Sequence, residues 1–591
     1  MKILGVYYGH TSTAALLVDG VITDCVSEER FTNVKNQSGL PKNSITYILQ
    51  KHKLTGLDLD AVVVPVRSTA PIYASEENKK SLFIQLVNFI YYRIPLVKNT
   101  YGFVSFYNPR LRNLGRLFYQ LFSRTVGVYT SSKERKLLAD YLNIPSDKLV
   151  AHDHHKSHAF AGYYASKFSK EKALVLTLDA EGDGVCATVN VFNKGRYERI
   201  SRTHADNSLG LMYAAVTKHL GMKVGEHEYK VMGLAPYAKE YSINKAFIKV
   251  QDLFRLGGKD NLEIHSKFDM RQMPKYLREE MSEVRFDVLA GVFQKVLEDT
   301  VLAWVRQAIK VTGVDTLCCT GGVFMNVKLN QKITELPEVG KVFFMPSGSD
   351  ESSPLGACFV SYVESLKSTY RDPEIEPIKD LYLGPSYSLQ AVKDFLDENS
   401  VADKYKVEYF EDIEKRIALL LSEKKIVGRL SGRMEWGARA LGNRTILANP
   451  SDPEVVMIIN EQMKDRDFWM PFAPSILKER AGDYLVNPKN VEAPYMVLSF
   501  ATTPLGRGDL KAALHPYDFT CRPQIVEESW NPKYYKIIKE FENLTGIGGV
   551  LNTSFNLHGY PIVLGPKEAY NAFEKSGLQY LALENYLISK L

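Results

Sequence analysis

The chain has few cysteines. Only six of its 591 residues are cysteine, and no two of them have CxxC spacing. Thiols scattered in this way, mostly in apolar strand-like stretches, predict a reduced core and exclude a disulfide framework. The first ten residues carry one positive charge and a short apolar run, which predicts a first β-strand and not a signal peptide. We therefore expect a cytoplasmic protein.

Long hydrophobic runs are also missing. The best candidate, residues 81–97, is interrupted by polar residues, Arg93 and Pro95 before it reaches the ~20 residues of a membrane span. It lies in residues 79–133, which lack Asp and Glu and carry nine positive charges, more than the net +6 (74 − 68) of the whole chain. These are Lys79, Lys80, Arg93, Lys98, Arg110, Arg112, Arg116, Arg124 and Lys133. We expect a helical insertion over residues 75–140. Its cationic face is either merely solvated or contacts an amphiphilic acceptor or a membrane surface.

Several catalytic and binding signatures are absent. No Gly-Lys-Ser/Thr of a Walker loop accompanies the arginine-rich stretch of the C-terminal half, and no His-Glu-xx-His is present, which argues against a metallopeptidase. RNA-binding signatures are missing as well. The basic residues of the C-terminal half come with as many acidic and apolar ones, so we expect no nucleic-acid partner.

The length and the 45% hydrophobic content predict two or more globular domains. A proline-rich acidic stretch at residues 371–377 predicts a linker between domains at 1–370 and 378–591. Strands alternate with helices in both, which predicts an α/β class. Predicted strands at 3–8, 14–18 and 21–26, with a hairpin at Asp19 and Gly20, are typical of how actin-like ATPase and sugar-kinase folds begin.

His10 lies in the first turn of this opening. In actin-like folds that turn faces the nucleotide phosphates. A histidine at a strand end beside a metal could act as a general base. The alternative is a turn residue without a catalytic role.

Residues 151–160 contain four of the twelve histidines. If Asp153 caps a helix that continues through the small apolar residues, His154 and His158 fall at i and i+4 on one face. That spacing suits two imidazoles on one divalent metal ion. Alternatively, both are hydrogen-bonded structural histidines.

Two carboxylates follow predicted strands of the same domain. An apolar strand at residues 173–178 leads into Asp179 and an acidic, glycine-bearing turn, and residues 342–345 lead toward Asp350. Two histidines and two carboxylates would form a mixed nitrogen and oxygen site that suits iron, manganese or zinc. We expect Fe²⁺ first, with Mn²⁺ or Zn²⁺ as alternatives.

Two further stretches are candidates for binding phosphate. Gly321 and Gly322 follow a predicted strand at 316–319, itself preceded by a predicted helix over 286–311, and backbone amides at the next helix could hold a nucleotide. A double glycine at this position could instead only allow tight packing. Residues 428–444 place four arginines among glycines, a pattern that suits phosphate oxygens because the guanidinium fork binds them bidentately.

The motifs together resemble one family, the NodU/CmcH-type O-carbamoyltransferases, which include the tobramycin and cephalosporin carbamoyltransferases. The resemblance covers nearly the whole chain. It rests, in order, on residues 27–32, the His154 and His158 element, Asp179, residues 230–236 and 321–323, Asp350, and residues 439–444, 471–475 and 552–556.

The resemblance implies an N-terminal actin-like ATPase domain, similar to the tRNA threonylcarbamoyl transferases, and a C-terminal YrdC-like α/β domain, similar to the threonylcarbamoyl-AMP synthases. It implies that the C-terminal domain makes carbamoyl-AMP from carbamoyl phosphate and ATP with Mg²⁺. The N-terminal metal site would then pass the carbamoyl group to a hydroxyl of a sugar or natural product, with His10 as base.

The resemblance also assigns binding residues. The implied nucleotide-binding residues of the N-terminal domain are Gly182, Asp183, Lys230, Gly321, Gly322 and Asn326. The implied residues for carbamoyl phosphate and ATP in the C-terminal domain are Arg439, Arg444, Lys464, Arg466, Arg522, Asn552 and Ser554.

Two positions depart from the family pattern. Tyr229 replaces the glycine of Glu-Gly-Lys, and Met470 replaces the arginine before Pro-Phe-Ala-Pro. One phosphate contact is therefore either missing or supplied by Arg466.

Two other functions stay open. A tRNA threonylcarbamoyl-type modifying enzyme would use tRNA as acceptor, and a non-enzymatic actin-like ATP-binding module would release no pyrophosphate. The sequence also leaves open whether the chain forms a homodimer.

Overall fold

The structure of the protein, a computed structural model, describes residues 1–68, 75–80, 85, 112–367 and 373–590. The chain divides into two compact units. We call Met1–Glu28 with Asn36–Ile378 the N-terminal unit, and Glu29–Lys35 with Lys379–Leu591 the C-terminal unit. The short segment Glu29–Lys35 clusters with the C-terminal unit, where Arg30 Nη2 donates to the Gly437 carbonyl oxygen at 2.8 Å. No sequence pattern indicated that Glu29–Lys35 belongs with the C-terminal unit.

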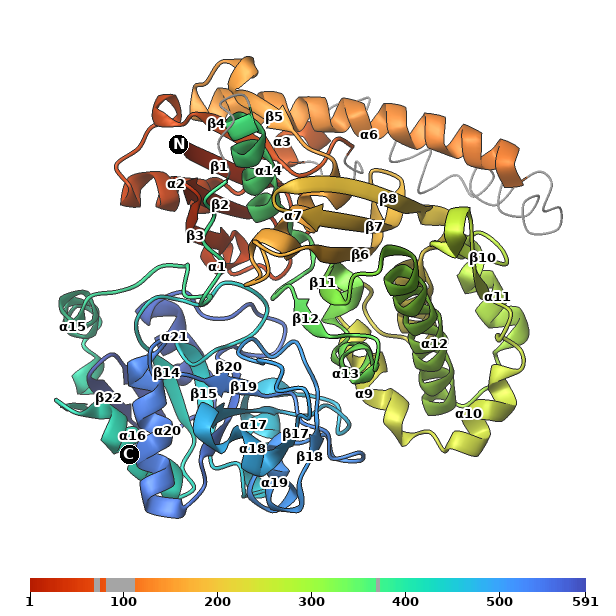
Figure 1. Cartoon of the computed structure of the whole chain (residues 1–591). Helices are drawn as coiled ribbons and strands as arrows, with labels where there is room; N and C mark the ends of the chain where they lie inside the picture. The colour runs from red at the N-terminus through yellow and green to blue at the C-terminus, as the bar shows by residue number, and fades with distance from the viewer. Residues whose placement is uncertain (69–74, 81–84, 86–111, 368–372, 591) are drawn as a thin grey trace. The chain divides into compact units, whose positions relative to one another are not determined.

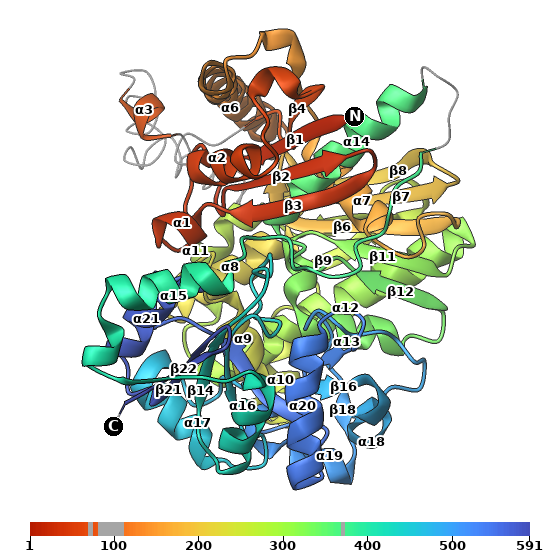
Figure 2. The same ribbon diagram turned by 90° about the vertical axis from the view of Figure 1, so that its left-hand side faces the viewer.

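The N-terminal unit opens with the predicted strands β1 (Lys2–Tyr7), β2 (Thr13–Val18) and β3 (Val21–Ser27). The hairpin at Asp19 and Gly20 is confirmed, with φ of +48° and +87°, as a turn with two left-handed residues requires. Strands β4 (Ala61–Val64) and β5 (Leu149–Ala151) continue the sheet in parallel with β1. Its strand order is β3-β2-β1-β4-β5, and Figure 2 shows β3, β2, β1 and β4 in this order.

A second sheet of this unit repeats the first. Strands β6 (Ala173–Gly182), β7 (Val185–Asn193) and β8 (Arg196–His204) are antiparallel, and β11 (Thr316–Thr320) and β12 (Lys341–Phe344) add in parallel beside β6. The order β8-β7-β6-β11-β12 therefore matches the first sheet strand for strand. Two such sheets in one unit form the actin-like arrangement that the opening strands predicted.

Each of the two sheets is packed against one helix, and these two helices pack on each other. Helix α7 (His154–Tyr164) packs on β6 and β11, α14 (Ser353–Lys367) packs on β1 and β2, and the two helices pack on each other (Figure 1). Gly356 permits this approach, because a Cβ atom there would lie 1.8 Å from the Ser157 carbonyl oxygen. The N-terminal ends of both helices face the region where the predicted metal ligands lie.

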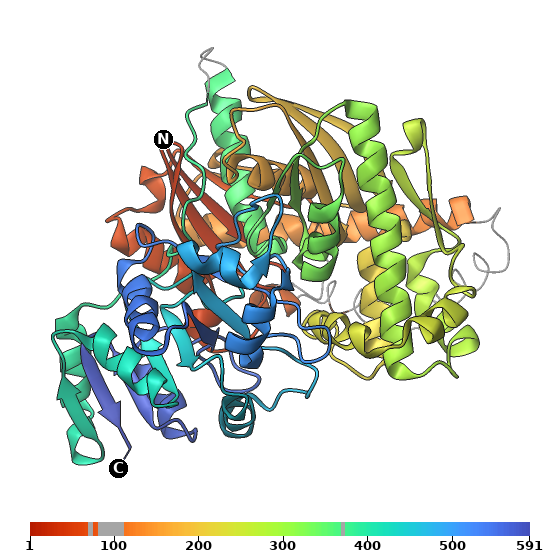
Figure 3. The same cartoon turned by 60° about the horizontal axis from the view of Figure 1, so that its bottom comes forward.

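Further helices complete the N-terminal unit, and α12 appears in yellow-green in Figure 3. They are α2 (Lys42–Lys51), α3 (Glu76–Lys79), α6 (Arg112–Leu142), α8 (Leu209–His219), α9 (Glu228–Leu234), α10 (Glu240–Phe247), α11 (Met273–Glu280), α12 (Phe286–Thr312) and α13 (Val327–Glu335), with a small hairpin of β9 (Phe254–Gly257) and β10 (Glu263–Ser266). The predicted helix over 286–311 is confirmed as α12, which ends at Gly313 in the left-handed conformation, φ +64°.

Most of the basic segment 79–133 lies outside the described residues, including Arg93, Lys98 and Arg110. Helix α6 covers its C-terminal end. In the part of the chain that the structure describes, none of the helices combines the length and apolar character that a membrane crossing requires.

The C-terminal unit is built on a mixed eight-stranded sheet, which confirms its predicted α/β class. The strand order is β13-β22-β21-β14-β15-β20-β16-β19. The strands are β13 (Lys406–Tyr409), β14 (Val427–Leu430), β15 (Arg444–Ala448), β16 (Ala473–Leu477), β19 (Gln524–Val526), β20 (Gly549–Ser554), β21 (Tyr580–Leu583) and β22 (Tyr586–Ser589). A separate pair consists of β17 (Leu485–Val486) and β18 (Ala501–Thr502).

Helices cover both faces of this sheet. Neighbouring strand residues alternate between two cores, as Ile446 and Leu447 show, because successive side chains point to opposite faces. Helices α16 (Ile413–Ser422) and α20 (Pro532–Thr545) cover one face, and α15 (Leu389–Glu398), α17 (Glu454–Ile459) and α21 (Pro566–Glu574) cover the other. Short helices α1 (Glu29–Thr32), α18 (Ala481–Tyr484) and α19 (Pro504–Asp509) complete the unit.

Candidate functional site

Helix α7 begins where its sequence predicts. Asp153 is the N-cap, and its carboxylate accepts a hydrogen bond from the Lys156 backbone N–H at 2.8 Å. Arg199 Nη2 lies 2.5 Å from the same carboxylate. Burial alone would raise the pKa of Asp153, but the Arg199 guanidinium outweighs it and lowers this pKa to about 2. The cap is therefore ionised, and it fixes the first turn of the helix.

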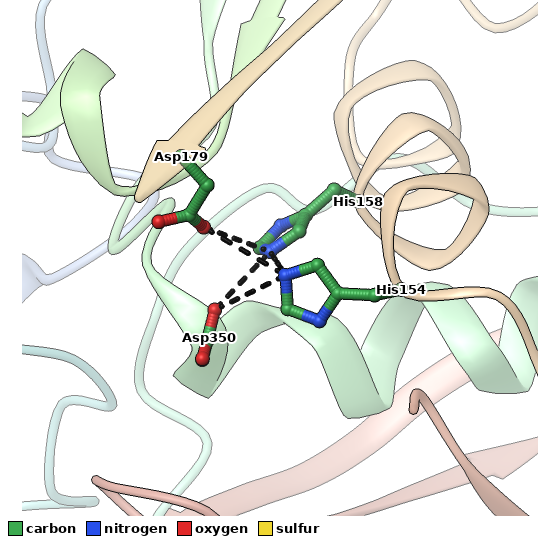
Figure 4. Close-up of side chains that lie close together, drawn as sticks. All are labelled: His154, His158, Asp179 and Asp350. Carbon is green, nitrogen blue, oxygen red and sulfur yellow. Dashed lines mark hydrogen bonds and ion pairs between the residues drawn. The ribbon is translucent and has the colours of Figure 1, made fainter. Parts of the chain in front are cut away.

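The two predicted histidines point at one spot. His154 Nε2 and His158 Nε2 are 3.1 Å apart, and both side chains are buried (Figure 4). One nitrogen or oxygen atom from each of His154, His158, Asp179 and Asp350 lies within 4.8 Å of the others. We call these four residues the His–Asp cluster.

Each carboxylate of the cluster arrives on an irregular piece of backbone. Asp179 lies in β6 where the pairing with β7 shifts register, and its Oδ2 is 3.3 Å from His158 Nε2. Asp350 opens a 3₁₀ turn, Asp350–Ser352, that leads into α14, and its Oδ1 is 3.4 Å from Nε2 of each histidine. Asp350 follows β12 only after a loop, so it lies further from the strand end than the sequence indicated.

The cluster favours a cation. Burial lowers the pKa of His154, but the negative charges of Asp350 and Asp179 outweigh burial and raise this pKa to about 9. Asp179 Oδ2 is buried and accepts no hydrogen bond among the described residues. Two imidazole nitrogens and two carboxylate oxygens are ligands that iron, manganese and zinc accept. The residues present therefore fit a divalent metal ion.

The adjacent His155 has a different role. Its Nδ1 is 2.7 Å from Thr177 Oγ1 and its Nε2 is 2.9 Å from the Val185 carbonyl oxygen. Burial, together with the neighbouring histidines, lowers its pKa to about 3. His155 is thus a hydrogen-bonded structural histidine.

Gly182 and Asp183 support helix α7. A Cβ atom on Gly182 would lie 2.0 Å from His154 Cδ2, so the imidazole occupies the space that a side chain would need. The Asp183 carboxylate accepts backbone hydrogen bonds from His154 at 3.0 Å and Ser68 at 2.9 Å. Both residues, expected to bind nucleotide, are therefore engaged in positioning His154 and its helix.

The double glycine serves two different purposes. Gly321 has φ +103°, and a Cβ atom there would lie 2.3 Å from the Leu178 carbonyl oxygen, so this residue allows tight packing. A Cβ on Gly322 would lie 3.1 Å from Asp179 Oδ1, which places Gly322 beside the cluster. Asn326 caps α13 and hydrogen-bonds to Gln294. Lys230 lies on α9, next to the departure at Tyr229.

His10 lies beside the cluster, in the turn after β1. Its Nδ1 is 3.5 Å from Asp350 Oδ2, and 36% of its side chain is exposed. It therefore combines contact with a cluster carboxylate and access from solvent. The sequence did not indicate a third partner, Tyr7, whose hydroxyl donates to Asp350 Oδ2.

The C-terminal unit buries the amino group of one predicted ligand. Lys464 ends a π-helical turn, Asn460–Lys464, and is 3% exposed. Its Nζ donates to the Ser554 carbonyl oxygen at 2.5 Å and to Asn556 Oδ1 at 2.6 Å. Burial, followed by the positive charges of Arg466 and Lys35, holds the pKa of Lys464 well below its ordinary value. No carboxylate among the described residues pairs with it.

Two other predicted ligands of this unit are committed to internal contacts. Arg444 is fully buried, and its guanidinium donates to the carbonyl oxygens of Ser431, Gly432, Asn443, Pro385 and Leu564. Asn552 bonds to Thr445, Ser475, Gln524 and the Ala440 carbonyl oxygen. Arg444 therefore connects backbone loops, and its contact with substrate stays a prediction.

The remaining predicted residues lie nearer the solvent. Ser554 Oγ is 3.2 Å from Lys464 Nζ, and Arg466 Nη2 is 3.3 Å from Thr553 Oγ1. Arg439 and Arg522 are partly exposed. Met470, which departs from the family pattern, is buried.

Comparisons with known proteins match both units. The family described as Carbamoyltransferase N-terminus matches residues 2–359, and Carbamoyltransferase C-terminus matches residues 418–590. An uncharacterized protein of Methanocaldococcus jannaschii is 31% identical, with all of both chains covered. Nodulation protein NolNO of Sinorhizobium fredii is 29% identical over 98% of this chain and 79% of its own.

Similarity to solved structures is low. The structure of T. kodakarensis HypF is 14% identical and covers 62% of this chain and 48% of its own, with a TM-score of 0.33. The family models, by contrast, cover most of the chain, and they agree with the motifs from residue 27 to residue 556. The chain therefore belongs to the carbamoyltransferase family, and it is an enzyme of the NodU/CmcH type.

Proposed function

We propose that the chain is an ATP-dependent O-carbamoyltransferase with two sites, one in each unit. The C-terminal unit forms carbamoyl-AMP from carbamoyl phosphate and ATP. The N-terminal unit transfers the carbamoyl group to a hydroxyl of a sugar or another small molecule. The proposal adds the adenylate intermediate and the acceptor class to the family's carbamoyl transfer.

The observation that carries the first half is the buried Lys464. The Lys464 amino group is surrounded by neutral oxygens and lies near Arg466, and the described residues place no carboxylate there to compensate a positive charge. Burial of such a charge is unfavourable unless an anion pairs with it. Carbamoyl phosphate and the triphosphate of ATP supply that charge, and Ser554 lies within reach of the same ammonium. Arg439, Arg466 and Arg522 are the further cations that we assign to these substrates.

The atoms balance only if water takes part. Carbamoyl phosphate loses its phosphate to water and leaves carbamate. A carbamate oxygen then attacks the α-phosphorus of ATP, and pyrophosphate departs. Each carbamoyl-AMP thus forms with one phosphate and one pyrophosphate. The role of Lys464 and the arginines is to neutralise and orient the two anionic substrates.

In the N-terminal unit, His154, His158, Asp179 and Asp350 would hold a divalent metal ion, with Fe²⁺ as the first candidate. When bound, the ion supplies Lewis-acid polarisation of the carbamoyl carbonyl. His10 accepts the proton of the acceptor hydroxyl, whose oxygen forms the new bond to the carbamoyl carbon while AMP leaves. Gly322 borders the cluster without a side chain, and a Cβ atom there would crowd the Asp179 carboxylate at 3.1 Å.

The test is carbamoyl phosphate-dependent release of pyrophosphate from ATP by the purified full-length chain. We expect equal amounts of phosphate and pyrophosphate, and we expect Lys464→Met to abolish both while the metal content stays unchanged. Pyrophosphate release by wild type without carbamoyl phosphate would contradict the first half. Carbamoylation of tRNA in place of sugars would favour a tRNA-modifying enzyme.

A further inference from the structure

The Asp350 carboxylate faces two groups at once. Its Oδ1 is 3.4 Å from Nε2 of His154 and of His158. Its Oδ2 is 3.5 Å from His10 Nδ1 and accepts a hydrogen bond from the Tyr7 hydroxyl. A rotation of this carboxylate would change both the ligand geometry and the contact with His10. The group that fixes its rotation therefore matters for both.

Tyr7 is placed to fix it. The residue ends β1, where it pairs with Thr13 of β2, and it is 6% exposed. Its ring lies edge-on to the His10 ring, with centroids 6.3 Å apart and planes at 82°. Apart from the histidines, the Tyr7 hydroxyl is the one hydrogen-bond donor to the Asp350 carboxylate among the described residues.

Gly9 provides the space for this phenol. A Cβ atom on Gly9 would lie 2.2 Å from Tyr7 Oη and 2.4 Å from Tyr7 Cζ. Real Cβ atoms do not approach another heavy atom so closely, so any other residue at position 9 would displace the ring. This steric observation is independent of the hydrogen bond, and it indicates the same position for the hydroxyl.

The cluster has little other support of this kind. In many metal sites, each histidine donates its second ring N–H to an outer partner that fixes the ring. Here Nδ1 of His154 and Nδ1 of His158 are buried without a hydrogen-bond partner among the described residues. The Tyr7 hydroxyl is thus the outer contact through which strand β1 orients a cluster ligand.

We propose that Tyr7 is a positioning residue for carbamoyl transfer, which holds Asp350 so that one carboxylate oxygen faces the metal site and the other faces His10. With His10 Nδ1 facing this carboxylate, His10 Nε2 is the nitrogen that accepts the proton of the acceptor. Tyr7 touches neither substrate nor metal and acts through Asp350. The inference rests on the metal site and the base of the proposed function.

The first test is the affinity of the full-length protein for Co²⁺, titrated by its visible absorption in wild type and Tyr7→Phe. Loss of an outer partner typically weakens metal binding 10- to 100-fold, and we expect about that loss with a changed absorption spectrum. Phenylalanine keeps the ring and removes only the hydroxyl. The matched control is Tyr8→Phe, which removes a hydroxyl from the next residue, also buried, and should leave Co²⁺ affinity unchanged.

A second variant keeps the test independent of the folding of Tyr7→Phe. Gly9→Ala should displace the intact phenol and weaken Co²⁺ binding by a similar factor. If both changes act through the Tyr7 hydroxyl, the double variant should bind Co²⁺ as tightly as the single variant with the lower Co²⁺ affinity. Multiplied effects would show that Gly9 and Tyr7 act separately and would overturn the inference.

The outcomes distinguish this inference from the proposed function. A wild-type protein that binds no Co²⁺ would refute the metal site itself. A wild-type protein that binds Co²⁺, together with a Tyr7→Phe variant of equal affinity and spectrum, would overturn the role of Tyr7 alone. Pyrophosphate release should be equal in all these variants, because it depends on the C-terminal unit.

Discussion

The two sites of this enzyme are built with opposite charge. The His–Asp cluster of the N-terminal unit collects two carboxylates and two imidazoles around one spot, and the carboxylates raise the pKa of His154. The C-terminal unit instead buries the Lys464 amino group among neutral oxygens near Arg466 and Lys35, which lowers the pKa of Lys464. The first arrangement favours a bound cation and the second a bound anion. Under the proposed function, each unit therefore serves a different half of carbamoyl transfer.

The two candidate sites also differ in how well the types of their residues predict what those residues do. All four histidine and aspartate candidates converge, because a helix places i and i+4 on one face and two sheets bring distant strand ends together. The C-terminal candidates separate into two groups. Arg444 and Asn552 bond to the protein itself, whereas Lys464 and Ser554 lie together. An arginine among glycines serves equally well to connect backbone loops and to bind phosphate.

The largest effect that we expect within the N-terminal site is that of His10→Ala. General-base catalysis typically contributes about 10²- to 10⁴-fold, so transfer of the carbamoyl group to a sugar acceptor should slow by about that factor. The measurement is single-turnover transfer from preformed carbamoyl-AMP. Metal content and pyrophosphate release should match wild type. A variant that loses metal in proportion to its activity would show His10 to be a ligand or a structural residue.

Arg444 and Arg439 sharpen the comparison within the C-terminal unit. Arg444→Met leaves buried carbonyl oxygens without donors and should cost about 3–5 kcal/mol of unfolding free energy, visible as a lower Tm. Arg439→Ala should leave the Tm near that of wild type and abolish pyrophosphate release. If Arg444→Met were fully stable but inactive, Arg444 would return to the substrate site.

The smallest expected effect concerns Lys464 and pH. Its pKa in the folded protein lies below the unfolded value of about 10.4, so between these values the unfolded chain binds more protons. Stability in phosphate-free buffer should therefore rise with pH in this window, because the buried charge is progressively lost. Below the folded pKa, its cost should be about 1–2 kcal/mol.

Thermal unfolding of wild type and Lys464→Met between about pH 5 and about pH 10 checks this. The Tm difference should favour the variant at the acidic end of this range and shrink as pH rises. Added phosphate should raise the Tm of wild type only. A difference that does not change with pH would mean that Lys464 keeps one protonation state throughout.

Much of the fold and of the His–Asp cluster could be predicted from the sequence. Local patterns fixed the hairpin at Asp19 and Gly20, the cap at Asp153 and the length of α12. Contacts between distant segments could not be predicted in this way. The association of Glu29–Lys35 with the C-terminal unit leaves no periodic pattern, and the steric role of Gly182 depends on the His154 side chain, 28 residues away (182 − 154).

The central claim is that the two half-reactions use separate sites, and a crossed pair of variants tests it most directly. Pyrophosphate release and acceptor carbamoylation are measured for His158→Ala and Lys464→Met, with His152→Asn as a control histidine outside the cluster. We predict that His158→Ala loses bound metal and carbamoylation but keeps pyrophosphate release, and that Lys464→Met keeps its metal but loses both activities. Equal loss of pyrophosphate release in His158→Ala and Lys464→Met would contradict two separate sites.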